Sequence, residues 1–175
     1  MNFPVFSSHI ANYAFNWCSS LTNVTIGKCV SNIGSYAFSG CSSLISIKVS
    51  ENNDKYLSLN GLLLSKDGKN VFQGVNGIVV VPEGVTNICS NAFYNLFSLK
   101  RVTIPNSVTN IGSEAFSGCY SLSSITIPEN VLNIGYKTFN NCSGLKKVVF
   151  TNPKTSVYYS ARTSATEESF AFLGL

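Results

Sequence analysis

Apolar residues recur along the chain at a fixed interval, separated by the same polar residues in each copy. The clearest copy spans Val108 to Pro128. This copy contains Phe116, which follows an alanine. Together with its equivalents in the other copies it forms a series at intervals of 23, 55, 23 and 23 residues: Phe15, Phe38, Phe93, Phe116 and Phe139. A fixed period of this size indicates a solenoid, in which each unit buries its apolar side against the next.

The second half of each copy predicts a short strand. Leu122, Ile125 and Ile127 contain the period-2 alternation of a strand with one buried face. Strands from successive copies are expected to stack in parallel, and Pro105 and Pro128 are expected to end them because proline lacks an amide donor.

The first half of each copy predicts core residues and a turn on the opposite side. Val108 and Ile111 are expected to point inward, and Phe116 to fill the middle. Two residues beyond each phenylalanine, four of five positions are glycine or asparagine, which favours the end of a helical turn. The sequence therefore predicts an α/β repeat protein: a right-handed solenoid with parallel strands on one face and short helical segments on the other.

The 55-residue interval equals 23 plus 32, so an insertion of about residues 50–77 interrupts the repeat. Ile78–Val81 is expected to be a further strand, because Val81-Pro82 realigns with later copies. Within the insertion, Leu62–Ser65 and Val71-Phe72 flank an Asp-Gly pair, which predicts a β-hairpin protruding from the coil.

The length of 175 residues favours a single solenoid over residues 1–175. Residues 151–175 are expected to form a degenerate last repeat or a cap, because Ala171-Phe172 repeats the Ala-Phe pair. A capping-box pattern at Ser164–Glu167 predicts, as the alternative, a short helix over Glu168–Leu173.

The frame Val-x-x-Ile-Gly-x-x-Ala-Phe-x-Gly-Cys-x-x-Leu-x-x-Ile-x-Ile-Pro resembles the BspA-like leucine-rich repeats. The resemblance covers roughly residues 8–150, and Asn52–Gly68 looks like an insertion common in that family. It implies a surface protein of bacteria of the mouth and gut or of mucosal parasites, associated with adhesion to extracellular-matrix proteins and to other cells. An intracellular protein-interaction scaffold is the alternative function.

Composition and charge narrow the function further. With 45% apolar and 11% charged residues, the chain is not disordered. The net charge of +4 is too small to favour nucleic acid, although residues 91–175 carry seven bases against four acids. No apolar run reaches the length of a membrane span, and the segment Met1–Phe6 lacks the basic region of a signal peptide. Neither a leader nor an anchor is therefore expected.

Catalytic and metal-binding patterns are missing from the sequence. The single histidine, His9, stands in the column of Asn32, Asn87, Asn110 and Asn133, whose side chains are expected to hydrogen-bond a turn. There is no recurring acid pair and no Gly-x-Ser-x-Gly motif, so we expect no enzyme, no cofactor and no metal site.

Four of the six cysteines, Cys18, Cys41, Cys119 and Cys142, share one repeat column with Leu96. Because leucine replaces cysteine in one copy, the column is predicted to be apolar and buried, with free thiols rather than disulfides. Cys89 stands in a glycine column and is expected to be a small interior filler, while Cys29 is expected nearer the surface.

The outward positions of the strands are the predicted binding face, and hydroxyl and basic groups dominate them. Lys48, Arg101 and Lys147 are candidates for binding carboxylates or sulfates; the competing interpretation is that these side chains only keep the face soluble. The resemblance implies a matrix protein or acidic glycan as partner, and uncapped solenoid ends allow self-association. The predicted site residues are Lys48, Lys100, Arg101, Thr103, Ser124, Thr126, Lys146 and Lys147; Thr22, Asn23, Thr25, Ile45, Ser46, Ser123 and Val149 complete the face.

Overall fold

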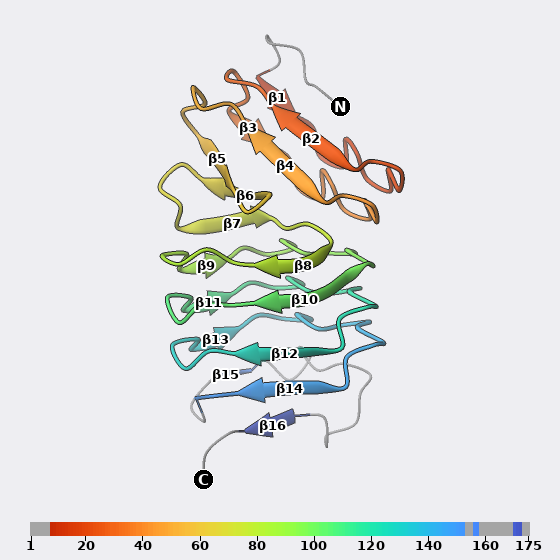
Figure 1. The fold of residues 1–175 in the computed structure, drawn as a ribbon, viewed down its shortest axis with the longest axis vertical. Coiled ribbons are helices and arrows are strands. Elements are labelled where there is room, and N and C mark those ends of the chain that lie inside the picture. The colour runs from red at the N-terminus through yellow and green to blue at the C-terminus, as the bar shows by residue number, and fades with distance from the viewer. Residues whose placement is uncertain (1–7, 153–155, 158–169, 173–175) are drawn as a thin grey trace.

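The computed structural model describes residues 8–152, 156–157 and 170–172 and is a β-solenoid (Figure 1). None of these residues is helical, so none forms a helix long and apolar enough to cross a membrane. The strands are β1 (His9–Ile10), β2 (Asn23–Ile26), β3 (Asn32–Ile33), β4 (Ser46–Val49), β5 (Tyr56–Leu59), β6 (Leu62–Ser65), β7 (Asn70–Gln73), β8 (Gly77–Val80), β9 (Asn87–Ile88), β10 (Leu99–Thr103), β11 (Asn110–Ile111), β12 (Ser124–Ile127), β13 (Asn133–Ile134), β14 (Lys147–Phe150), β15 (Ser156–Val157) and β16 (Phe170–Phe172).

The longer strands β2, β4, β8, β10, β12 and β14 lie on one side, here called the front face. Where they pair, they are parallel: β2 with β4, β8 with β10, and β12 with β14. In β12, Ile125 and Ile127 are buried while Ser124 and Thr126 are exposed. The predicted strands and their alternation are thus confirmed, and β8 confirms the further strand expected at the end of the insertion.

A second set of parallel strands, not predicted, forms the back of the solenoid. It consists of two-residue Asn-Ile strands such as β9, β11 and β13, which continue into β7. Asn110 Nδ2 donates to Asn87 Oδ1 (2.7 Å), and Asn87 Nδ2 donates to Asn70 Oδ1 (3.0 Å). These asparagines form a ladder between coils rather than the predicted turn bonds, because parallel in-register strands place identical side chains over one another.

The predicted helical segments are wrong, and the backbone gives the reason. Glu114 (φ 55°) and Gly118 (φ 75°) both adopt left-handed conformations only four residues apart. The amides of Glu114, Phe116 and Gly118 donate to the next coil, at carbonyls of Tyr136 (2.8 Å), Thr138 (3.0 Å) and Asn140 (2.8 Å). In a helix, each of these amides would donate to the carbonyl four residues back. Here alternate amides donate to the neighbouring coil instead.

Phenylalanine rings form the centre of the core. Phe38, Phe93, Phe116 and Phe139 are each at most 1% exposed. The ring of Phe116 stacks on Phe93 at 4.9 Å and on Phe139 at 5.9 Å between centroids. The predicted interior position is confirmed for these four rings, while Phe15 in the first coil is partly buried. The stacked rings bind one coil to the next.

The insertion lies within the stack. β5, β6 and β7 form an antiparallel meander, and β7 pairs in parallel with β9, so the meander extends the back sheet. The predicted hairpin that protrudes from the coil is therefore replaced by a three-stranded unit inside the sheet. Its β5–β6 turn, Asn60-Gly61, has two positive φ angles (53° and 78°), as in a type I′ turn.

The tip of the β5–β6 turn reaches the front face and occupies the space between β4 and β8. The amide of Ile47 donates to Gly61 O (2.8 Å), and Asn60 Nδ2 donates to Val80 O (3.1 Å). The turn thus bridges two front strands that are not paired with each other.

Two buried asparagines fix the insertion to the coils beside it. Asn53 Nδ2 donates to the carbonyls of Gly27 (2.9 Å) and Val30 (2.8 Å), while its Oδ1 accepts from the amides of Lys55 (2.9 Å) and Tyr56 (2.8 Å). The side chain of Asn53 therefore donates two hydrogen bonds to the preceding coil and accepts two from the insertion.

Asn76 makes the equivalent bridge at the other end of the insertion. Its Nδ2 donates to the carbonyl of Cys41 (2.9 Å), and its Oδ1 accepts from the amide of Ser98 (3.0 Å). The insertion is consequently held at both ends by amide side chains that the sequence analysis did not single out.

At the C-terminus, β16 pairs with β14 and places Ala171 opposite Val149. Ala171-Phe172 therefore lies in the front-strand register rather than in the Ala-Phe column where the repeat alignment placed it. The same strand replaces the alternative helix over Glu168–Leu173 at residues 170–172. The capping-box segment Ser164–Glu167 lies outside the described residues.

Candidate binding site

All eight predicted site residues are exposed: Lys48, Lys100, Arg101, Thr103, Ser124, Thr126, Lys146 and Lys147. Ser124 lies opposite Lys147, and Arg101 occupies the equivalent position on β10, so these three form one row. Lys48 lies in the next row, opposite Thr25 on β2. Val149, which the sequence placed on the same face, is buried between β12 and β16.

Lys48 is also separated from Arg101 along the stack. The Asn60-Gly61 turn and β8 lie between them, and this region carries exposed aliphatic side chains. Ile45 is 59% exposed, Ile78 70% and Val80 52%. The structure therefore does not bring Lys48, Arg101 and Lys147 together as one basic stripe.

A groove opens on the front face between β10 and β12. No backbone hydrogen bond joins these two described strands, and Figure 1 shows them further apart than β8 and β10. The groove has a volume of about 350 Å³ and is lined by Arg101, Val102, Thr103, Ile104, Ser124, Ile125 and Thr126. Four of the eight predicted residues thus line one hollow.

The opening is confined to the front. On the back, β11 and β13 remain paired in register. On the front, β10 carries one extra residue relative to β8, because Leu99 pairs with Gly77 but Arg101 pairs with Ile78. Such a bulge bends a strand and ends regular pairing, and the core positions Val102 (5%) and Ile104 (7%) are slightly exposed.

The groove combines three kinds of binding group. The facing edges of β10 and β12 present unpaired backbone N–H and C=O groups. The guanidinium of Arg101 matches a carboxylate or sulfate, while Thr103, Ser124 and Thr126 offer hydroxyls. Lys147 lies beside Ser124, and no acidic residue lines the groove. This arrangement suits an extended, acidic segment.

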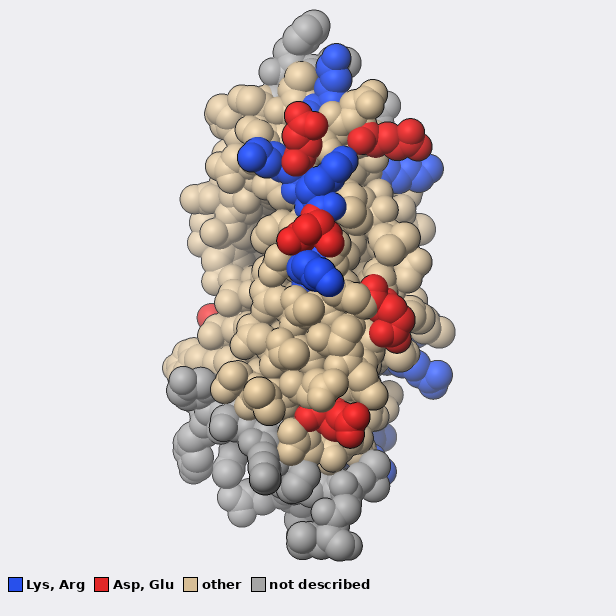
Figure 2. Space-filling view, turned by 90° about the vertical axis from the view of Figure 1, so that its left-hand side faces the viewer, with Lys and Arg blue, Asp and Glu red and all other residues tan. Residues whose placement is uncertain are grey.

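The edge at which the front strands end differs from the groove in carrying both positive and negative side chains (Figure 2). Figure 2 shows lysines and acidic residues interleaved along it, which excludes a field of one sign. At the β6–β7 turn, a hydrogen bond from the Ser65 hydroxyl lowers the pKa of the Asp67 carboxyl. The charged residues of these loops include Lys28, Glu51, Asp54, Lys55, Lys66, Asp67, Lys69 and Glu83.

Three of the four column cysteines, Cys41, Cys119 and Cys142, are buried as predicted, whereas Cys18 in the first coil is exposed. The thiol of Cys119 donates to Phe93 O (3.1 Å), and the other two make the same bond to the preceding coil. Burial raises the pKa of Cys41 to about 11 and that of Cys142 to about 12. Thiols held in this way are inert at neutral pH.

The remaining candidates for chemistry are scattered. Cys29 is exposed, as expected, and His9 is exposed with its Nδ1 2.8 Å from Ser8 Oγ. Among the described residues, no group of three His, Cys, Asp or Glu side chains is placed to hold a metal ion.

Repeated coils with short parallel strands and a central phenylalanine column define a leucine-rich-repeat protein. The chain belongs to the BspA type leucine-rich repeat family, whose repeat pattern matches six copies over residues 1–59 and 67–171. Repeats of this type are typically binding modules. No curated protein matches the chain significantly.

Three solved structures share the fold. A leucine-rich repeat protein from Eubacterium ventriosum is 30% identical, with a TM-score of 0.76 over 90% of this chain. A leucine rich cell surface protein from Faecalibacterium prausnitzii is 23% identical (TM-score 0.65, 98% of this chain), and the pneumococcal vaccine antigen PcpA is 22% identical (TM-score 0.63, 94%). This chain spans 42%, 53% and 53% of their respective lengths.

Proposed function

We propose that this chain is a non-catalytic binding module of a cell-surface adhesin, and that the groove between β10 and β12 recognises an extended acidic segment of a protein partner. The observation that carries the proposal is the convergence of Arg101, Thr103, Ser124 and Thr126 on one groove with unpaired strand edges. The surface location is supported by the cell-surface relative in Faecalibacterium prausnitzii.

Recognition combines main-chain and side-chain contacts. An extended segment hydrogen-bonds to the free edges of β10 and β12, as in other cases of strand addition. A carboxylate of that segment pairs with Arg101 in bidentate geometry, and Lys147 adds charge beside it. The core side chains of Val102 and Ile104 form the apolar floor.

Binding of the purified chain to fibronectin, laminin and collagen tests the proposal. We expect at least one salt-sensitive interaction, weakened about tenfold or more by Arg101→Glu with Lys147→Glu because two favourable charges become repulsive. Lys48→Glu is the matched control, since it reverses an exposed lysine of the same face outside the groove.

Equal losses in the groove variant and in the Lys48→Glu variant would place recognition elsewhere and contradict the groove. Antibody labelling of intact cells that naturally express the protein separates an adhesin from an intracellular scaffold. Absence of label on intact cells, with label after permeabilisation, favours the scaffold.

A further inference from the structure

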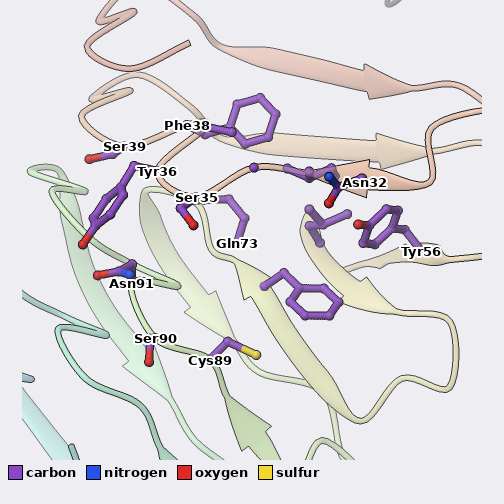
Figure 3. Close-up of a pocket in the computed structure, with 15 residues that line it drawn as sticks. Asn32, Ser35, Tyr36, Phe38, Ser39, Tyr56, Gln73, Cys89, Ser90 and Asn91 are labelled. Carbon is purple, nitrogen blue, oxygen red and sulfur yellow. The ribbon is translucent and has the colours of Figure 1, made fainter. Parts of the chain in front are cut away.

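A pocket of about 310 Å³ opens on the back of the solenoid, between the turn that follows β3 and the insertion (Figure 3). It exists because the back ladder is interrupted at this point. Among the described strands, β3 pairs only with β1, while β5 is the edge strand of the seven-stranded back sheet and does not pair with β3. The pocket volume falls at the lower end of the range for small-molecule sites.

The pocket wall is polar but uncharged. None of its lining residues is Lys, Arg, Asp, Glu or His. Side-chain amides come from Asn32, Gln73 and Asn91, and ring walls come from Tyr36, Tyr56 and Phe72. Amides offer both donors and acceptors, whereas aromatic rings offer flat apolar surfaces.

Tyr36 and Asn91 form the most constrained part of the wall. The ring of Tyr36 is stacked on Tyr13 and lies edge-on to Tyr94, each at 5.3 Å between centroids. Figure 3 shows its hydroxyl directed toward Asn91. The Asn91 Oδ1 atom is buried and has no hydrogen-bond partner among the described residues. Such an acceptor is unfavourable unless a donor reaches it.

We propose that this pocket binds a neutral sugar unit, such as the terminal residue of a glycan. Sugar hydroxyls exchange hydrogen bonds with the side-chain amides of Gln73 and Asn91 and with the hydroxyl of Tyr36, while the C–H face of the ring packs on the aromatic wall. The absence of charge from the lining favours a neutral sugar over sialic or uronic acids, whose carboxylates would be desolvated without a partner. This inference is independent of the groove, which lies on the opposite face.

Isothermal titration calorimetry and saturation-transfer NMR on the full chain test the pocket with glucose, galactose, mannose, fucose and N-acetylglucosamine. N-acetylneuraminic acid and glucuronic acid are the charged comparisons. We expect at least one neutral sugar to bind with a Kd of about 1 mM or lower. The charged sugars are expected to bind about tenfold more weakly or not at all.

Two variants locate the binding. Asn91→Gly removes the amide and keeps the left-handed backbone (φ 62°), and Tyr36→Phe removes one hydroxyl while keeping the ring stack. Each is expected to weaken sugar binding about tenfold, as for loss of one well-placed hydrogen bond. Tyr120→Phe is the matched control, because Tyr120 is also a stacked tyrosine but lies outside the pocket.

Three results would overturn the proposal. One is no detectable binding of any neutral sugar at about 20 mM, well above the expected Kd. Another is unchanged binding in both Asn91→Gly and Tyr36→Phe. The third is equal binding of neutral and charged sugars. A variant with Arg101→Glu and Lys147→Glu is expected to retain sugar binding, so failure of the groove and failure of the pocket are distinguishable.

Discussion

A glycine column shows how closely the coils approach each other. A Cβ atom on Gly112 would lie 2.4 Å from the amide nitrogen of Ser90 in the preceding coil, and one on Gly135 would lie 2.4 Å from that of Ser113. Cys89 occupies the same column but follows the insertion instead of a regular coil. Its side chain finds room beside the pocket, so residue identity in this column depends on the preceding coil.

Gly112→Ala is expected to lower the free energy of unfolding by about 3 kcal/mol, because the new methyl group overlaps backbone that cannot move without separating two coils. Cys89→Ala, in the same column, is expected to cost less than about 1 kcal/mol. Urea unfolding followed by circular dichroism measures both. Equal costs would contradict close contact between coils as the origin of the glycine column.

The buried thiols predict a loss of stability at alkaline pH. Their folded pKa values, about 11 for Cys41 and about 12 for Cys142, exceed the ordinary value of 9.0. The unfolded chain therefore loses these protons first, so the stability contribution is complete below about pH 9 and falls as the pH rises toward 11. The slope is at most about 1.4 kcal/mol per pH unit for each thiol.

Urea unfolding at several pH values between 8 and 11 (a range of roughly one unit below to two above the ordinary thiol pKa) checks this. Cys142→Ala is expected to reduce the slope, and Cys29→Ala, at an exposed position, is expected to leave it unchanged. The same slope in both variants would contradict the assignment to buried thiols.

At the scale of elements, the strands followed from the sequence because alternation of apolar and polar residues sets which face is buried. The helical prediction failed because glycine and asparagine at the Gly118 and Asn141 column mark left-handed backbone, which occurs both in helix ends and in β-turns. The second left-handed position, at Tyr13, Tyr36, Asn91, Glu114 and Lys137, carries a residue that favours such a backbone only at Asn91, so the repeat pattern does not reveal it.

The insertion contains a second hairpin signal besides the predicted one. Asn60-Gly61 lies between two apolar runs and is a strong short hairpin signal. The predicted hairpin has its turn at Asp67-Gly68, where Gly68 (φ 72°) also turns the chain. Turns at Asn60-Gly61 and Asp67-Gly68 predict three strands between residues 56 and 73, and the structure has three there, β5 to β7.

The two candidate sites were not equally predictable. The outward row containing Arg101, Ser124 and Lys147 follows from the repeat alone. The groove and the pocket depend on how neighbouring coils separate, one at the bulge in β10 and the other beside the insertion. No single repeat contains that information. The glycine column contains one indication of the pocket, because Cys89 replaces glycine at the position where the pocket lies.

For the whole molecule, the insertion divides the stack. Strands β1 to β4 pair only among themselves in the described chain, and Figure 1 shows β2 and β4 inclined to β8, β10, β12 and β14. The N-terminal coils are therefore joined to the rest through the insertion, including Asn53, and through the ring contacts of Trp17 with Phe97 and of Tyr36 with Tyr94.

We expect the amides of β2 and β4 to exchange with solvent about tenfold or more faster than those of β12 and β14, because local opening there breaks fewer contacts between coils. Asn53→Ala, which leaves two carbonyls and two amides without their partner, is expected to widen this difference. Hydrogen-exchange mass spectrometry resolves the segments. Uniform acceleration across all strands would contradict a divided stack.

The amides that cross from each turn to the next coil have a mechanical consequence. Because left-handed turns are maintained by bonds to a neighbour, a coil at the end of the stack has support on one side only. A pulling force would therefore peel coils away one at a time. Each regular coil of 23 residues would release about 80 Å of extended chain, so a tether of this design lengthens in steps under load while the coils behind it keep their shape.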